Sequence, residues 1–135
     1  MGKIDLFVDF SKEIDFMVSE NEYTSFQKCS KDMNPLHVDE AFAQAHGFRE
    51  RVMYGNILNA FVSYAVGMEL PTQDVILLTQ SIQYKNPVFL NDKLVMKIKT
   101  VNISEAVQSV ELVYRIYNNE KKVVAKGNIM IGVLL

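Results

Sequence analysis

The chain has 135 residues, of which 49% are hydrophobic and 22% are charged, and its formal net charge at pH 7 is −2. This length is enough to bury a sizeable core, and the composition is ordinary for a globular protein. The slightly acidic balance excludes a general nucleic-acid binder, which needs a strongly basic face. We therefore expect one domain over residues 1–135.

Cysteine usage and the length of the apolar runs indicate where the protein works. Cys29 is the only cysteine, so no internal disulfide can form and a reducing compartment is expected. No apolar run in the sequence approaches the roughly 18–20 residues that cross a bilayer. The sequence thus predicts a cytoplasmic protein with no membrane or nucleic-acid partner.

The first elements along the chain are extended and then helical. Residues 4–18 alternate apolar and polar side chains, which predicts extended chain. Ser19 with Glu22 forms a capping-box pattern, which predicts a short helix running to about Cys29. We expect Tyr23, Phe26 and Gln27 on one side of this helix.

The next segment is Asp32-Met33-Asn34-Pro35-Leu36-His37. Asp and Asn bond their own backbone in turns, and proline fixes φ near the value of a bend. The segment is therefore predicted to be a rigid corner that belongs to no helix or strand. Asp32 and His37 would make a general acid/base pair if the corner turns both side chains to the same side. An isolated motif of this kind is equally compatible with an Asx-type turn that carries a surface histidine.

Two more helices are expected after the corner. Residues 39–45 begin with acids, as the helix dipole favours, and Gly47 suits the position after the helix end. His46 is expected to be an exposed helix-end histidine. Residues 55–68 are apolar on nearly every face, which predicts a helix buried within the fold. Gly55 at its start leaves backbone amides open to close approach.

The second half of the chain is rich in strand patterns. Strands are predicted over residues 75–86, 92–103, 106–117 and 122–134, separated by short polar turns. Together with one long apolar helix, they predict an α+β fold in which a long antiparallel sheet wraps around that helix. Cys29 is expected to be a buried or half-buried structural thiol in preference to a nucleophile.

Several segments together resemble a known family. The 32–37 segment matches the D-x-N-P-x-H signature of the MaoC-like, (R)-specific enoyl-CoA hydratases, and the resemblance covers roughly residues 12–134. Arg51-Val52-Met53-Tyr54-Gly55 stands where the family enters its central helix. Tyr84-Lys85-Asn86-Pro87-Val88-Phe89-Leu90-Asn91-Asp92 is similar to the family's aromatic-x-x-P-V-x-x-G-D segment. This resemblance implies the hot-dog fold.

The resemblance also implies a reaction, the reversible addition of water across a trans-2-enoyl thioester of fatty acid metabolism, catalysed by a lyase. Asp32 and His37 would hold the water and share the proton transfers. The Gly55 amide would stabilise the developing enolate oxygen. Asn34 would hold the corner or orient Asp32. Ser63 would either face the same pocket or bond back to the carbonyl of Asn59.

Three positions depart from the family pattern. Lys31 stands where glycine usually precedes the acid, and it fits there only with a negative φ or at the cost of some strain. Tyr54 replaces a histidine, which puts the shape and polarity of the pocket mouth in question and makes Tyr54 a candidate substrate-binding residue. Asn91 replaces a turn glycine, a mild change because asparagine tolerates the left-handed conformation.

No metal or redox cofactor is expected, since coenzyme A or acyl carrier protein would arrive as part of the substrate. A single hot-dog unit leaves a sheet edge uncovered, so a homodimer is the expected minimum assembly. Two other functions stay open. A hot-dog thioesterase has no use for the Asp32–His37 pair. The protein could also be a non-catalytic acyl-CoA-binding protein. In that case Lys31 and Tyr54 would be signs that the site is decayed or re-purposed.

Overall fold

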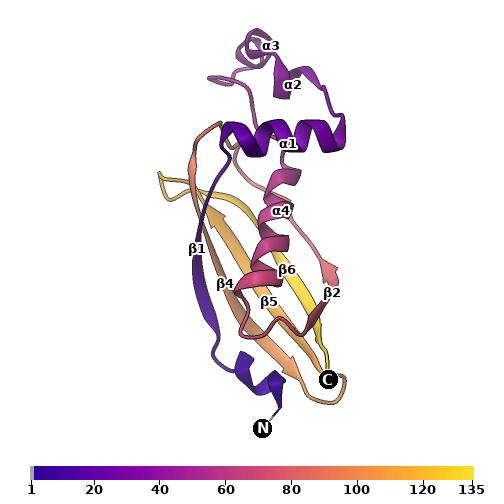
Figure 1. Ribbon diagram of the computed structural model, residues 1–135. Coiled ribbons are helices and arrows are strands. Elements are labelled where there is room, and N and C mark those ends of the chain that lie inside the picture. The colour runs from indigo at the N-terminus through magenta and orange to yellow at the C-terminus, as the bar shows by residue number, and fades with distance from the viewer. Residues whose placement is uncertain (1) are drawn as a thin grey trace.

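A six-stranded antiparallel sheet frames the molecule in a computed structural model that describes residues 2–135. Five strands follow the order β1-β4-β5-β6-β2, and the short β3 also pairs with β6 (Figure 1). Their bounds are Ser11–Met17 (β1), Val75–Gln80 (β2), Gln83–Tyr84 (β3), Lys93–Ser104 (β4), Ser109–Tyr117 (β5) and Val123–Val133 (β6). The strand-rich second half is confirmed, with the first predicted strand divided into β2 and β3.

The α-helices lie on one face of the sheet and beyond one of its ends, and the short N-terminal 3-10 helix lies at the opposite end (Figure 1). Figure 1 shows α4 running along the sheet face, α1 crossing the end of α4, and α2 and α3 lying beyond α1. Their bounds are Lys3–Phe7 (η1, a 3-10 helix), Glu20–Ser30 (α1), Pro35–Val38 (α2), Glu40–Ala45 (α3), Asn56–Tyr64 (α4) and Ala65–Glu69 (η2, a π-helical continuation of α4). Among residues 2–135, no helix combines the length and the apolar character needed to span a membrane.

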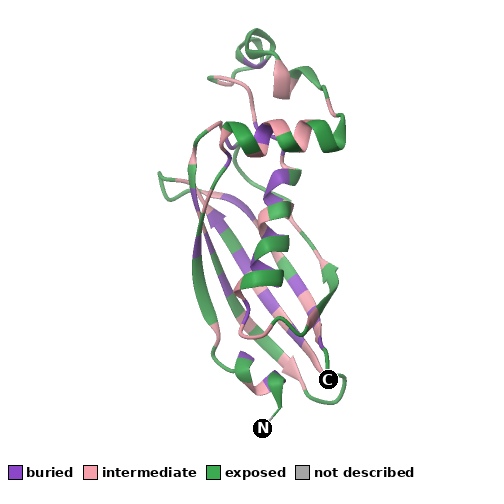
Figure 2. Cartoon of the chain, in the orientation of Figure 1, coloured by how far each residue is buried: buried purple, intermediate pink, exposed green. Residues whose placement is uncertain are grey.

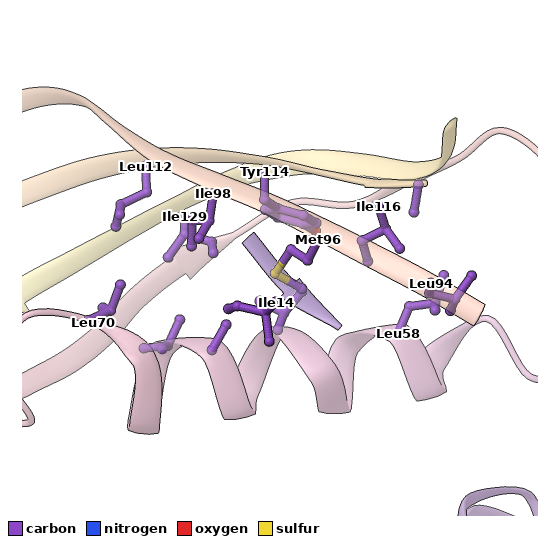
Figure 3. Close-up of a cluster of buried hydrophobic side chains, with 14 of the residues drawn as sticks. Ile14, Leu58, Leu70, Leu94, Met96, Ile98, Leu112, Tyr114, Ile116 and Ile129 are labelled. Atoms are coloured by element: carbon purple, nitrogen blue, oxygen red, sulfur yellow. The ribbon is translucent and has the colours of Figure 1, made fainter. Parts of the chain in front are cut away.

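The core lies between the sheet and α4. Residues of β5 alternate between the two faces, so that Leu112, Tyr114 and Ile116 are buried while Arg115 is exposed. Figure 3 shows these side chains pointing toward α4, with Leu58 of that helix lying beside Leu94. Burial of this one face stabilises the sheet through the hydrophobic effect and holds α4 in place.

The structure corrects the predicted extended segment at residues 4–18. Only Ser11–Met17 form a strand, because residues Lys3–Phe7 wind into η1. Ile4 and Phe7 are buried, and Leu6 is 54% exposed. A spacing of three between buried side chains is that of a 3-10 helix, whereas a strand would bury every second residue.

The prediction that the 55–68 helix is buried within the fold holds for one side of the helix only. Ile57, Leu58 and Val62 are buried against the sheet, but Ser63 and Tyr64 are exposed (Figure 2). The sheet covers one side of α4, which leaves a partly apolar face open. The α+β arrangement of a long antiparallel sheet with one central helix is confirmed.

Two expectations for α1 have different outcomes. The helix begins after Ser19 as predicted, although the Ser19 hydroxyl donates to the Glu22 carboxylate (2.7 Å) and caps no backbone amide. Cys29 was expected to be buried or half-buried and is exposed, because it falls on the side of α1 away from the core.

One glycine in β6 is required by a close approach of two backbones. A Cβ atom on Gly127 would lie 1.9 Å from the carbonyl oxygen of Ser81, in the segment between β2 and β3. The same carbonyl accepts a 2.8 Å hydrogen bond from the Tyr114 hydroxyl. Burial raises the pKa of Tyr114 to about 12, so this donor keeps its proton at neutral pH.

Replacement of Gly127 by alanine should therefore destabilise the fold strongly. Because a backbone oxygen blocks the new methyl group, we expect Gly127→Ala to lower the free energy of unfolding by about 3 kcal/mol or more. Urea denaturation followed by circular dichroism measures the loss. Gly67→Ala is the matched control, since a Cβ at Gly67 meets nothing within 4 Å. Equal stability of the two variants would contradict this account.

Candidate active site

The candidate site begins where α1 ends, at a lysine in a left-handed conformation. Lys31 has φ 60° and ψ 18°, and its amide donates to the Gln27 carbonyl (2.9 Å). This region favours glycine, so Lys31 carries strain of about 1 kcal/mol. The sequence left two possibilities for Lys31, a negative φ or a strained conformation, and the structure shows the strained conformation with positive φ. Asn91, which replaces a turn glycine, also has a positive φ, of 67°. Asparagine tolerates this left-handed conformation.

The segment after Lys31 is organised by two side chains that bond to backbone amides. Asp32 Oδ1 accepts from the amide of Asn34 (2.9 Å), and Asn34 Oδ1 accepts from the amide of Leu36 (3.0 Å). Asn34 is thereby the N-cap of α2, with Pro35 in its first turn. The prediction that the whole corner lies outside any helix is wrong, because α2 takes in Pro35–Val38 and with it His37.

The structure brings His37 and Asp32 to the same side of this corner. His37 Nδ1 lies 2.8 Å from the Val52 carbonyl oxygen, and its Nε2 faces Asp32 Oδ2 at 3.9 Å. A carbonyl can only accept, so Nδ1 carries the proton of the neutral ring and Nε2 keeps a free lone pair. One water about 2.8 Å from each can bond to both Nε2 and Oδ2.

A cavity of about 330 Å³ opens beside His37. Its lining is mostly apolar and includes Leu58, Tyr84 and Val88 together with Tyr54 and Gly55. The volume is within the range of small-molecule sites. His37 therefore lines an apolar pocket, with the Asp32 carboxylate 3.9 Å from its Nε2.

Gly55 lies at the start of α4 and lines this cavity. Its amide donates no hydrogen bond to any residue of the described chain, 2–135. A Cβ at this position would lie 2.9 Å from Cε1 of Tyr84, so any other residue would push that ring aside. The Tyr84 hydroxyl donates to Asn56 Oδ1 (3.2 Å), which holds the ring over the helix start.

Tyr54 lies behind the pair. It is 3% exposed, its hydroxyl donates to the Asp32 carbonyl, and its ring centroid is 4.3 Å from that of His37. Burial raises the pKa of Tyr54, while the hydrogen bond from Gln27 opposes the shift. The residue therefore forms a wall of the cavity and a support for the motif at once.

Two other candidates lie apart from the cavity. Ser63 is exposed on α4, on the side that the sheet leaves open. His46 is exposed at the end of α3, as predicted, with its Nδ1 2.8 Å from the Phe42 carbonyl. Within residues 2–135, no group of three or more His, Cys, Asp or Glu side chains is placed to hold a metal ion.

Sequence reasoning missed three contacts of the site. Tyr23, Gln27 and the Val52 carbonyl all touch the motif or its support. Tyr23 and Gln27 are four residues apart on the predicted helix, so they lie on the same helix face. This spacing could have indicated that both polar groups of that face point toward the interior of the protein. A backbone carbonyl such as that of Val52 leaves no trace in the residue types.

Comparison with known proteins places the chain in a family. A family profile described as "MaoC like domain" matches residues 6–123. The chain belongs to the MaoC-like family. It is 30% identical over 110 residues to a protein named (R)-specific enoyl-CoA hydratase from Aeromonas caviae, an alignment that covers 82% of each chain.

Solved structures of this MaoC-like family have the same fold. A structure described as an (R)-hydratase from A. caviae involved in PHA biosynthesis superposes with a TM-score of 0.86 at 26% identity, covering 93% of this chain and 95% of that one. The unliganded R-hydratase PhaJ1 of Pseudomonas aeruginosa gives 0.85 at 28% identity, covering 93% and 81%. The predicted hot-dog fold is confirmed.

Lys31, which precedes Asp32 and has a left-handed backbone conformation, allows the local strain to be tested. We expect Lys31→Gly to raise the free energy of unfolding by roughly 0.5–1 kcal/mol, because glycine adopts this φ without the Cβ clash. Lys28→Gly, within the last turn of α1, should lower it by a similar amount. Thermal and urea unfolding of both variants measure the difference. A loss of stability in both would refute the strain at Lys31.

Proposed function

We propose that this MaoC-like protein is an (R)-specific enoyl-thioester hydratase. In the reverse direction the same site would act as a 3-hydroxyacyl-thioester dehydratase. We also propose that it acts in the cytoplasm on an acyl thioester of coenzyme A or of an acyl carrier protein. The single observation that carries the proposal is the placement of Asp32 Oδ2 and His37 Nε2, 3.9 Å apart, beside an apolar cavity.

The pair has the geometry to activate a water. His37 Nε2 accepts a proton from the water while the water oxygen bonds to Cβ of the enoyl thioester. The imidazolium that forms is stabilised by the Asp32 carboxylate and by the Val52 carbonyl at Nδ1. A proton then passes from Nε2 to Cα, so that the ring returns to its neutral form and the thioester has gained one water.

The Gly55 amide is our candidate for the donor to the thioester oxygen. This oxygen gains negative charge as Cβ is attacked, and a preorganised donor at a helix start stabilises it. Gly55 suits the role because it stands at the N-terminus of α4, lines the cavity and has no acceptor within residues 2–135. The apolar lining around Leu58 and Val88 would take the acyl chain.

A homodimer is our proposal for the assembly. β2 pairs with β6 on one side, and its other edge pairs with nothing in residues 2–135. Ile76, Leu77 and Leu78 on this strand are 53%, 42% and 54% exposed. An exposed apolar edge strand is the surface that a second copy would cover.

The catalytic proposal predicts large losses of turnover in two variants. We expect Asp32→Asn and His37→Ala each to lower the hydration of crotonyl-CoA at least about a hundredfold, within the range of acid/base residues, with the fold intact. Loss of enoyl absorbance measures the rate, and circular dichroism checks the fold. The exposed histidine supplies the control, since His46→Ala should keep the parental rate.

The same assay separates the other functions. Near-normal hydration by Asp32→Asn would sink the assignment of the pair. Release of free thiol without loss of enoyl absorbance would instead indicate a thioesterase. Binding of acyl-CoA with no turnover, unchanged in both variants, would indicate an acyl-binding protein.

The dimer proposal predicts that a charge on β2 dissociates the protein. Leu78→Lys places an ammonium group in the proposed interface, where burial without a partner is costly. We expect the parent chain to sediment as a dimer and Leu78→Lys as a monomer in analytical ultracentrifugation. Val107→Lys, at a 72% exposed position in the turn after β4, should remain a dimer. A monomeric parent chain would overturn the proposal.

A further inference from the structure

Behind Asp32 and His37 lies a set of hydrogen bonds that ends on the backbone of both residues. The Tyr54 hydroxyl donates to the Asp32 carbonyl, and the Tyr23 hydroxyl donates to the His37 carbonyl (2.7 Å). The side-chain nitrogen of Gln27 lies 3.3 Å from the Tyr54 hydroxyl and 3.4 Å from the Tyr23 hydroxyl. One amide group of α1 thus joins the two phenols that hold the two site residues.

The donors and acceptors of this set match one another. A phenol has one proton to give and can also accept, and a glutamine side-chain nitrogen has two protons. Gln27 can therefore donate one proton to each phenol, while each phenol donates its own proton to a carbonyl. The Tyr23 and Tyr54 side chains are 5% and 3% exposed, so water competes little for these bonds.

Three aromatic rings lie around the Tyr54 phenol. The Tyr54 ring lies 5.0 Å from the ring of Phe26, 5.7 Å from that of Tyr23 and 4.3 Å from that of His37, centroid to centroid. Tyr54 thus contacts the backbone of Asp32 and the imidazole of His37 with two parts of one rigid side chain. A shift of this ring would move both site residues.

Asp32 depends on this contact more than His37 does. The other hydrogen bonds of Asp32 go to Ser30 and Asn34, both two residues away, whereas Tyr54 is 22 residues distant. Lys31 before it is strained, and the Asp32 side chain is 43% exposed. His37 by contrast is also held by Val52, at 2.8 Å from Nδ1.

We propose that Tyr23, Gln27 and Tyr54 form a positioning network that sets the separation of Asp32 Oδ2 and His37 Nε2. The inference rests on the proposed function, since that separation governs whether one water can bond to both groups. Tyr54 is the principal positioning residue. Without its hydroxyl, the Asp32 loop relaxes away from His37 while the apolar cavity keeps its lining.

Single and double variants test the network through turnover. We expect Tyr54→Phe and Tyr23→Phe each to lower kcat for crotonyl-CoA hydration by about 10- to 100-fold with KM changed less than about threefold, since misplaced groups slow chemistry more than binding. Because both phenols help to set one separation, that of Asp32 Oδ2 and His37 Nε2, the double variant should lose little more than the worse single variant. Gln27→Leu should give a similar loss.

The matched control separates positioning from general support. Phe26→Leu removes a ring that packs on Tyr54 from the same helix and makes none of these hydrogen bonds. It should lower the melting temperature and leave kcat within about twofold of the parent. Kinetic losses in Phe26→Leu equal to those in Tyr54→Phe would overturn the proposal, as would fully multiplicative losses in the double variant.

A second measurement needs no turnover. The Asn34 amide bonds to Asp32 Oδ1, so its hydrogen exchange reports on the order of the loop. Exchange should be faster in Tyr54→Phe and Tyr23→Phe than in the parent and unchanged in Phe26→Leu. A parent chain that fails to hydrate enoyl thioesters would refute the proposed function alone. Unchanged Asn34 exchange in both tyrosine variants would refute the network alone.

Discussion

The packing of α4 against the sheet is the constraint on which the site depends. Ile57, Leu58 and Val62 bury this helix on the sheet face, and the chain that leads into it is held there with them. The Met53 amide donates to the Val88 carbonyl (2.8 Å), which fixes the residues on either side. The Val52 carbonyl that orients His37, the Tyr54 phenol and the Gly55 amide therefore all take their places from one packed helix.

The motif itself has little core of its own. Met33 is exposed, the Asp32 side chain is 43% exposed, and α2 is a single turn with no buried residue. Local bonds through Asn34 and Pro35 shape this segment, but its position relative to α4 comes from contacts made by distant residues. A site with a partly exposed carboxylate can therefore still have a defined geometry. Local hydrogen bonds set the conformation of the 32–37 segment, and contacts with the core set its position relative to α4.

Two of the three departures from the family pattern, Lys31 and Tyr54, fall within this same region. Lys31 holds a left-handed conformation that glycine would adopt without strain, and Tyr54 adds a buried hydroxyl that must find an acceptor. That acceptor is the carbonyl of Asp32, the residue next to Lys31. The two departures thus meet at one peptide segment, where a long-range hydrogen bond supports a turn whose own conformation is unfavourable.

The sequence by itself determined what depends on near neighbours. The period-two alternation of β5, the apolar run of α4 and the turn chemistry of Asn34 and Pro35 all follow from residues within a few positions of one another. These features, with the family motif, were enough for the hot-dog fold and for a hypothesis about the catalytic pair.

Only the tertiary structure decided which distant groups meet. It placed the Val52 carbonyl on His37 Nδ1, Gln27 between two phenols, and Tyr84 over Gly55. It also exposed one side of α4, because the number of faces a helix buries depends on what the rest of the chain can cover. The physical reason is the same in each case: such contacts follow from the packing of elements, and no short stretch of sequence contains both partners.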